Sequence, residues 1–259
     1  MLNIHSNLPC DRRPSHRLLS IFAAVAGLLA THPAAAQSKP EPTNPTVRAG
    51  YVEPLTPENS FLVLVDLQDM FGVTVSSIDQ TALVNNAVGI AKAAKVFNVP
   101  TILATANAKT FAGPFFPQVT QARKDLTTYD RTAINLWDDS RVVQEIHRSG
   151  RRKIVIGGLW TASCVMLPAL SALKDGYEVY VLADVSADIN RETHDRAFQR
   201  LIQAGATPIS WIALMLEWQR DWARKDTAGK VVAIAKEHGG AWGMGADYVG
   251  AMGVGSEAK

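Results

Sequence analysis

Short apolar runs alternate with longer amphipathic stretches along most of the chain, beginning near residue 61. A continuous run such as Phe61-Leu62-Val63-Leu64-Val65 is typical of a strand buried on both faces. Runs of this kind predict strands at 61–65, 101–105, 126–129, 153–156, 177–183 and 207–210. Apolar residues at helical spacing, with polar caps and terminal glycines, predict helices at 79–96, 138–149, 161–175, 190–204 and 211–222. This alternation predicts parallel βαβ units and an α/β fold, a three-layer α/β/α sandwich with a mostly parallel sheet.

The first 36 residues follow a different pattern, which is that of a secretory signal peptide. Arg12, Arg13 and Arg17 precede an apolar run at 18–30, and Ala34-Ala35-Ala36 offers a cleavage site before Gln37. The alternative is a membrane anchor, but a spanning helix needs about 20 apolar residues. We therefore expect cleavage, a periplasmic or secreted protein, and no membrane attachment afterwards. The pattern leaves open whether the Sec or the twin-arginine route is used.

Composition divides the rest of the chain into three parts. Residues 37–58 contain five prolines and predict an extended linker or arm. Residues 59–225 contain the predicted strands and helices and form the main domain. Residues 226–259 are rich in glycine, and we expect this tail either to be irregular or to pack on a partner chain.

Charge and cysteine content change once the signal peptide is removed. The full chain has a formal net charge of +2, from 26 Lys and Arg against 24 Asp and Glu; losing three arginines and one aspartate leaves 23 of each. A near-neutral chain gives no reason to expect nucleic acid as a partner. Cys10 is lost with the signal peptide, so Cys164 is left without an intramolecular partner. It is then a reactive thiol, an intermolecular bridge or a buried inert cysteine.

Asp66 and Cys164 are the residues most suggestive of chemistry. Asp66 ends the first predicted strand, and Cys164 lies in the first turn of the helix predicted after the fourth. In a parallel sheet both positions open on the crevice at the carboxyl ends of the strands. We expect Thr161 to cap that helix, and the helix dipole to lower the pKa of the Cys164 thiol. Arg131, after the third predicted strand, is placed to reach the same crevice.

Two motifs resemble those of the isochorismatase-like cysteine hydrolases, closest to their YcaC-like subfamily. Val65-Asp66-Leu67-Gln68 is similar to the first motif, and Gly158-Leu159-Trp160-Thr161-Ala162-Ser163-Cys164-Val165 to the second. Supporting stretches are 134–138, 167–172 and 203–206, and the resemblance runs from about residue 59 to 222. It implies a Rossmann-like sheet and hydrolysis of an amide through attack by a cysteine.

The resemblance also implies roles for individual residues. Asp66 and Cys164 match two members of the family's Asp-Lys-Cys triad, and Arg131 stands at the position of the lysine, with Lys124 as the poorer match. Arginine stays charged and is not a ready proton carrier. The N–H groups of Trp160 and Cys164 are the expected oxyanion hole, and Gln68, Asn135 and Trp160 the expected substrate contacts. A cis peptide is expected between Leu159 and Trp160.

Partners and cofactors follow from the same comparison of motifs. A homo-oligomer acting on a small-molecule substrate is expected, with no cofactor. Metal is not expected, because the segment 105–109 lacks the Asp-x-His motif of nicotinamidases, and no Gly-rich phosphate loop follows the first strand. His194 is either a second base or a surface histidine. The aromatic side chains Trp137, Trp160, Phe71, Phe115 and Phe116 are either pocket or core, whereas Trp211, Trp218 and Trp222 predict a packing face.

Three function classes remain at this point. The leading prediction is an exported cysteine hydrolase that cleaves the C–N bond of a small amide or ureido compound through a thioester. The second is a thiol-based redox or peroxide-scavenging protein, which a lone low-pKa cysteine would support. The third is a non-catalytic member of the fold.

Overall fold

A single parallel sheet forms the centre of the structure, a computed structural model that describes residues 53–252. Its strand order is β3-β2-β1-β4-β5-β6, and every neighbouring pair is parallel. The strands are β1 (Ser60–Val65), β2 (Thr101–Ala106), β3 (Thr128–Arg131), β4 (Lys153–Gly158), β5 (Glu178–Leu182) and β6 (Thr207–Ile209). The α/β/α sandwich with a Rossmann-like sheet is confirmed.

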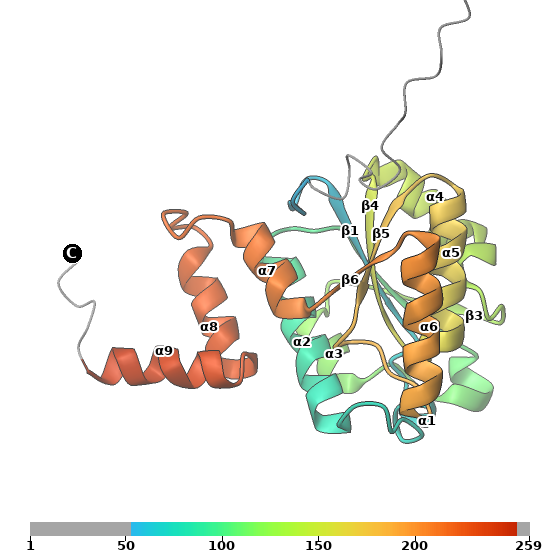
Figure 1. Ribbon diagram of the computed structural model, residues 1–259, viewed down its shortest axis with the longest axis horizontal. Coiled ribbons are helices and arrows are strands. Elements are labelled where there is room, and N and C mark those ends of the chain that lie inside the picture. Colours follow the sequence, from blue (N-terminus) through green and yellow to red (C-terminus); the bar gives the residue numbers. More distant parts are fainter. Residues whose placement is uncertain (1–52, 253–259) are drawn as a thin grey trace, which may run out of the picture. The chain divides into compact units, whose positions relative to one another are not determined.

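Helices cover both faces of this sheet (Figure 1). One face is covered by α2 (Gln80–Val96) and α7 (Trp211–Gln219), and the other by α4 (Ser140–Ser149), α5 (Met166–Lys174) and α6 (Arg191–Ala204). Within β1, Leu62 and Leu64 point to the α2 side, whereas Phe61, Val63 and Val65 point to the α5 side. Strands buried on both faces are continuously apolar for this reason.

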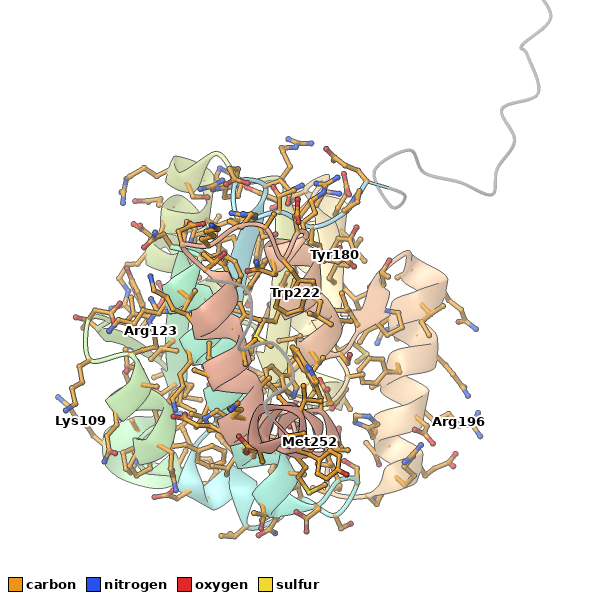
Figure 2. All side chains as sticks on the ribbon, turned by 90° about the vertical axis from the view of Figure 1, so that its left-hand side faces the viewer. Lys109, Arg123, Tyr180, Arg196, Trp222 and Met252 are labelled. Carbon is orange, nitrogen blue, oxygen red and sulfur yellow. The ribbon has the colours of Figure 1, made fainter. Side chains whose placement is uncertain are left out.

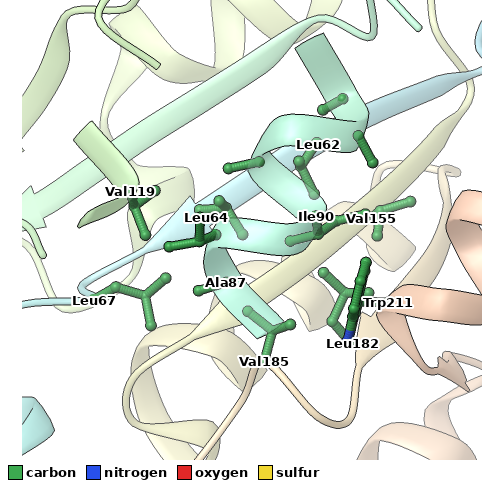
Figure 3. Packing of buried hydrophobic residues seen from close by; sticks show 14 of the residues in the cluster. Leu62, Leu64, Leu67, Ala87, Ile90, Val119, Val155, Leu182, Val185 and Trp211 are labelled. Carbon is green, nitrogen blue, oxygen red and sulfur yellow. The ribbon is translucent and has the colours of Figure 1, made fainter. Parts of the chain in front are cut away.

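The larger core cluster lies between the sheet and α2 (Figure 3). Ala87 and Ile90 of α2 pack on Leu62 and Leu64 of β1, and the indole of Trp211 packs beside them. Trp211 and Trp218 are fully buried, so the packing face predicted for this helix is confirmed for these two residues. Trp222 differs, because it lies past the end of α7 and half of its surface is exposed.

The structure corrects several element boundaries. The third strand begins at Thr128 rather than 126, which places Arg131 inside β3 instead of after it. The helix expected at 161–175 is a π-helical turn, η4 (Thr161–Val165), followed by α5. Three short elements were not predicted: α1 (Asp69–Gly72), η2 (Ala108–Ala112) and α3 (Pro117–Ala122). A short 3-10 turn, η3 (Leu136–Asp138), precedes α4.

The expectation of an irregular tail was wrong within the described part of the chain. Residues after 227 form α8 (Ala228–His238) and α9 (Ala241–Ala251), and α8 packs against α2 of the same chain. The end of the predicted linker also belongs to the domain, since Leu55 is fully buried and its N–H donates to Glu217 at 2.7 Å. Alanine and glycine occupy many positions of α8 and α9, so the two sequences lack the clear helical periodicity of large apolar residues that the earlier helices show.

The predicted signal peptide lies outside the described residues. Among residues 53–252, no helix is both long and apolar enough to cross a bilayer.

Candidate active site

Asp66 lies where the order in which the chain adds strands to the sheet reverses, between β1 and β4. Chain connections run outward from β1 through β2 to β3 on one side and from β4 through β5 to β6 on the other, and open α/β sheets usually bind ligands at such a reversal, here between β1 and β4. Asp66 is the first residue after β1 and has a left-handed backbone with φ of 53°. Opposite it, Gly158 ends β4 at φ of 150°, and an added Cβ would lie 1.8 Å from the Val65 carbonyl oxygen. Only glycine therefore allows β4 to pass so close to Asp66.

Arg131 reaches across from β3 and binds Asp66 with both ends of its guanidinium. Nη1 donates to Oδ1 at 2.6 Å and Nη2 to Oδ2 at 2.9 Å. Nη2 also donates to the Ile134 carbonyl at 3.1 Å. Both side chains are almost completely buried, so this is a bidentate pair inside the protein rather than a surface ion pair. Its position supports Arg131, and not the exposed Lys124, as the basic member of the site.

Cys164 is the third member of the group. It lies in η4, is buried, and its thiol is within hydrogen-bonding reach of the Asp66 carboxylate and the Arg131 guanidinium. The Ser163 hydroxyl also donates to Sγ at 3.8 Å. The sequence therefore identified three residues that the fold brings into one contact cluster from β1, β3 and η4.

The charge state of this cluster differs from the one expected. Burial, and then the negative charge of Asp66, raise the pKa of the Cys164 thiol to about 12, so the expectation of a lowered value was wrong. The neighbouring carboxylate and the loss of solvent both disfavour a thiolate, and neither is apparent from the helix position alone. Burial also raises the pKa of Asp66 above its ordinary value, although the bonds from Arg131 lower it. For Arg131, burial acts to lower the pKa, but the Asp66 carboxylate outweighs burial and raises it.

The turn that carries Cys164 is held by Asp188 and not by Thr161. The Leu159–Trp160 bond is cis, as expected, and Trp160 occupies the cap position without a side-chain hydrogen bond. Asp188, buried in the loop after β5, accepts a hydrogen bond from Ala162 N–H at 2.8 Å. The Thr161 hydroxyl instead lies 2.9 Å from His194 Nδ1. Only tertiary structure brings Asp188 to this turn, so no local signal in the sequence indicated it.

His194 is half-buried, and its Nδ1 contacts the hydroxyl of Thr161 in the turn that carries Cys164. Burial lowers the pKa of its imidazole. Its ring also lies against Phe198, with centroids 4.8 Å apart. These contacts place the imidazole against Thr161 and Phe198.

Gln68, Asn135 and Trp160, the three expected substrate contacts, differ in the contacts that their side chains make within the protein. The Gln68 amide accepts from Ala106 N–H at 2.8 Å and donates to the Gly113 carbonyl at 2.6 Å, so it joins β1 to the loop after β2. Asn135 accepts from Trp137 N–H and donates to Ser171, and thereby caps η3. Trp160 is half-buried and packs edge-to-face on Phe71, with ring centroids 4.9 Å apart. Of the three, Trp160 alone keeps its side chain free of backbone hydrogen bonds at the site.

Other aromatic side chains proposed as pocket residues lie mostly in the core. Phe115 and Phe116 are buried in the cluster on the α2 side, together with Phe71. Trp137 is partly buried, and its indole donates to Asp175 at 2.8 Å.

Comparison with known proteins places this arrangement in a family. Residues 60–213 match the Isochorismatase domain, which is more than half of the chain. The chain belongs to the isochorismatase family. Probable hydrolase YcaC of Escherichia coli is 35% identical over 188 residues, covering 72% of this chain and 87% of that protein. Isochorismatase domain-containing protein 2 of Xenopus laevis is 30% identical over 149 residues, covering 57% of this chain and 70% of that protein.

Solved structures of isochorismatase-family proteins agree with this assignment. YcaC of Escherichia coli, described as an octameric hydrolase of unknown specificity, has a TM-score of 0.73 at 29% identity and covers 77% of this chain and 97% of that one. YcaC of Pseudomonas aeruginosa, solved with hexane-2,5-diol and covalent acrylamide, has a TM-score of 0.72 at 29% identity, covering 78% and 98%. The chain is therefore a YcaC-like hydrolase of the isochorismatase family.

Proposed function

We propose that this protein is an exported cysteine hydrolase that cleaves the C–N bond of a small amide or ureido compound through a thioester. The observation that carries the proposal is the buried contact cluster of Asp66, Arg131 and Cys164. A nucleophile beside a base that is itself held by a third group is the usual arrangement for covalent catalysis. The YcaC-like relatives support the assignment as a hydrolase. The cluster of Asp66, Arg131 and Cys164 supports a reaction through a cysteine nucleophile.

The first half of the reaction forms the thioester. The Asp66 carboxylate takes the thiol proton as Sγ bonds to the carbonyl carbon of the substrate, and the carbonyl oxygen becomes an oxyanion. The N–H groups of Trp160 and Cys164 are the proposed donors to that oxyanion. The C–N bond then breaks, and the proton held by Asp66 passes to the leaving nitrogen.

The second half returns the enzyme to its starting state. Asp66 takes a proton from water as the water oxygen attacks the thioester carbon. The C–S bond breaks, the carboxylic acid product leaves, and Sγ regains a proton. Arg131 carries no proton in this scheme, because guanidinium remains charged. It keeps the Asp66 carboxylate oriented by its two hydrogen bonds.

The same observations weigh against a peroxide-scavenging role. Oxidation of cysteine by peroxide proceeds through an exposed thiolate of low pKa. Cys164 is buried and the pKa of its thiol is raised to about 12. A thiol in this state is a poor target for peroxide at neutral pH, whereas a base that takes its proton during attack can still make it a nucleophile, which favours hydrolysis over direct oxidation.

Ammonia release from a panel of small primary amides and ureido compounds tests the proposal. Turnover of at least one compound is expected from the wild-type protein and none from Cys164→Ala. A Cys164→Ala protein that is as active as wild type on every compound turned over, or a wild-type protein inactive on the whole panel, would contradict it.

Export is a separate part of the proposal and rests on the pattern of residues 1–36. The mature protein is then periplasmic or secreted, and its sequence begins at or near Gln37. N-terminal sequencing of the protein from the exported fraction checks this, and a retained Met1 in a membrane fraction would count against it.

A further inference from the structure

Four large apolar side chains stand exposed around the mouth of the site. They are Val73 at 71% exposure, Phe111 at 63%, Ile134 at 61% and Ile189 at 48%. Each lies in a different connection, after β1, β2, β3 and β5, and these connections leave the carboxyl edge of the sheet, where Asp66 and Cys164 also lie. We call these four residues the apolar rim. Exposed apolar groups gathered in one place commonly mark a binding surface.

Two members of the apolar rim are tied directly to the catalytic cluster. The Ile134 carbonyl accepts from Arg131 Nη2 at 3.1 Å, so Ile134 is fixed beside the Asp66 pair. Ile189 follows Asp188, whose carboxylate caps the turn of Cys164 through Ala162 N–H. The backbone of Ile134 and the residue before Ile189 are therefore anchored to the cluster of Asp66, Arg131 and Cys164 and to the turn that carries Cys164.

The other two members reach the site through aromatic contacts. The Phe111 ring meets the Phe71 ring at 6.0 Å between centroids, and Phe71 meets Trp160 at 4.9 Å. Val73 precedes Thr74, whose hydroxyl accepts from the Trp160 indole at 3.2 Å. Trp160 begins the nucleophile turn, so an apolar path runs from the exposed rim to the residues around Cys164.

Lysine and arginine are absent from most of the described segments around Asp66 and Cys164. The segments 66–79, 132–139, 159–165 and 183–190 contain no lysine or arginine. Arg131 has both Nη atoms engaged, and its Nε, although without a partner among the described atoms, is a single buried donor and not a fork for a carboxylate. Lys109, in the loop after β2, projects outward from the fold (Figure 2).

We infer that the substrate is an uncharged amide that carries an apolar group, and that the apolar rim binds this group while the amide carbonyl reaches Cys164. The inference rests on the proposed function and narrows its substrate class. An anionic substrate would meet the Asp66 carboxylate, and the described segments 66–79, 132–139, 159–165 and 183–190 offer no lysine or arginine to hold its charge. Burying an apolar group of phenyl size in such a site gains at least about tenfold in affinity.

Alkylation of Cys164 by a matched set of probes tests the inference without requiring turnover. The probes are iodoacetamide, N-benzyliodoacetamide and its 4-carboxybenzyl and 4-aminomethylbenzyl analogues. Labelling rates of the peptide that contains Cys164 are measured by mass spectrometry and divided by the rates with free cysteine. The benzyl probe should exceed iodoacetamide by about tenfold or more, and both charged analogues should lose most of that gain.

Substitutions in the apolar rim test whether the faster labelling by the benzyl probe depends on these residues. Phe111→Ala should reduce the benzyl preference severalfold, whereas Ile202→Ala, a control at an equally exposed residue near the end of α6, should not. Equal rates for benzyl and charged probes, equal effects of the two variants, or no labelling in the folded protein would overturn the inference. So would a loss of oligomer mass in Phe111→Ala with the preference unchanged, because the rim would then be a subunit contact. Ammonia release is measured separately, so failed hydrolysis and failed selectivity are distinguishable.

Discussion

At the scale of residues, the site is defined by an arginine where related enzymes are expected to carry lysine. The planar guanidinium of Arg131 binds both oxygens of Asp66, which a single ammonium group cannot match in geometry. In the proposed reaction the proton therefore has two places to reside on the enzyme, the Asp66 carboxylate and the Cys164 sulfur. The role that we propose for Arg131 is to supply a fixed positive charge and to orient Asp66.

Substitutions at Arg131 separate these two contributions. Arg131→Lys keeps the positive charge and should retain hydrolysis within about tenfold of wild type, a loss of about 1.4 kcal/mol. Arg131→Ala leaves the Asp66 carboxylate buried without a partner, and should lower the free energy of unfolding by about 3–5 kcal/mol and reduce kcat further. Steady-state kinetics and urea unfolding measure both. Lys124→Ala is the matched control and should change neither; a lysine variant as impaired as the alanine variant would contradict this role.

The raised pKa of Cys164 predicts an unusual response of its thiol to pH. In the wild type, iodoacetamide labelling should keep rising with pH towards about 12, with no plateau near neutrality, because only the thiolate reacts. Asp66→Asn removes the negative charge that helps to raise this pKa, so its labelling curve should move to lower pH. Hydrolysis by the same variant should fall by roughly 10²–10⁴-fold, because no base remains. A wild-type plateau below pH 8.5 would contradict the raised pKa of Cys164, and an active Asp66→Asn enzyme would contradict the role of Asp66 as the base.

Asp66 and Cys164 could be proposed as site residues from the sequence because each has a local signal. Asp66 ends an apolar run, and Cys164 lies in a motif at a strand–helix junction. No local signal indicated that the Gln68 side chain hydrogen-bonds to the backbone, because its partners Ala106 and Gly113 are distant in sequence. The pKa of Cys164 was misjudged for the same reason, since burial and a neighbouring carboxylate are tertiary properties.

At the scale of elements, the six strands and five main helices followed from periodicity, whereas the short elements did not. α1, η2 and α3 have four to six residues each, too few to establish a helical period. The sequence predicts an ordinary helix where the structure has the π-helical turn η4, because the apolar spacing of η4 continues into α5. Its cap comes from Asp188, in a loop two elements further along the chain.

Loss of the Asp188 cap should impair catalysis more than stability. Asp188→Ala removes the acceptor for Ala162 N–H and should cost about 0.5–2 kcal/mol in unfolding free energy. Because the same turn carries Cys164, kcat should also fall while KM changes little, and Asp188→Asn should restore part of kcat by keeping an acceptor oxygen. Asp79→Ala, which removes the corresponding cap of α2 at Ala82 N–H, is the control. Equal kcat losses in Asp188→Ala and Asp79→Ala would show that Asp188 has no positioning role.

At the scale of the whole molecule, the C-terminal helices are the largest departure from expectation. Met244, Tyr248, Val249 and Met252, on α9 and directly after it, are exposed, as is Trp222 before α8. Figure 2 shows Trp222 and Met252 on the same side of the molecule. The fold could be predicted as far as α7, because the family pattern and the strong periodicity both end near that helix.

Assembly into a homo-oligomer is the prediction at this scale. The Escherichia coli YcaC structure is octameric, and an apolar surface of this kind is common where subunits meet. Light scattering of the protein without residues 1–36 should give a mass several times that of one chain. The mass of a single chain at micromolar concentration would contradict it.

Trapping the acyl-enzyme tests the central claim most directly. The wild-type protein is mixed with an amide that it hydrolyses, quenched in acid, digested and analysed by mass spectrometry. The account predicts that the peptide containing Cys164 gains the mass of the acyl group, that hydroxylamine removes this mass, and that Cys164→Ala shows neither the adduct nor turnover. Hydrolysis that continues in Cys164→Ala, or an acyl group found only on another residue, would contradict the proposal that Cys164 is the nucleophile.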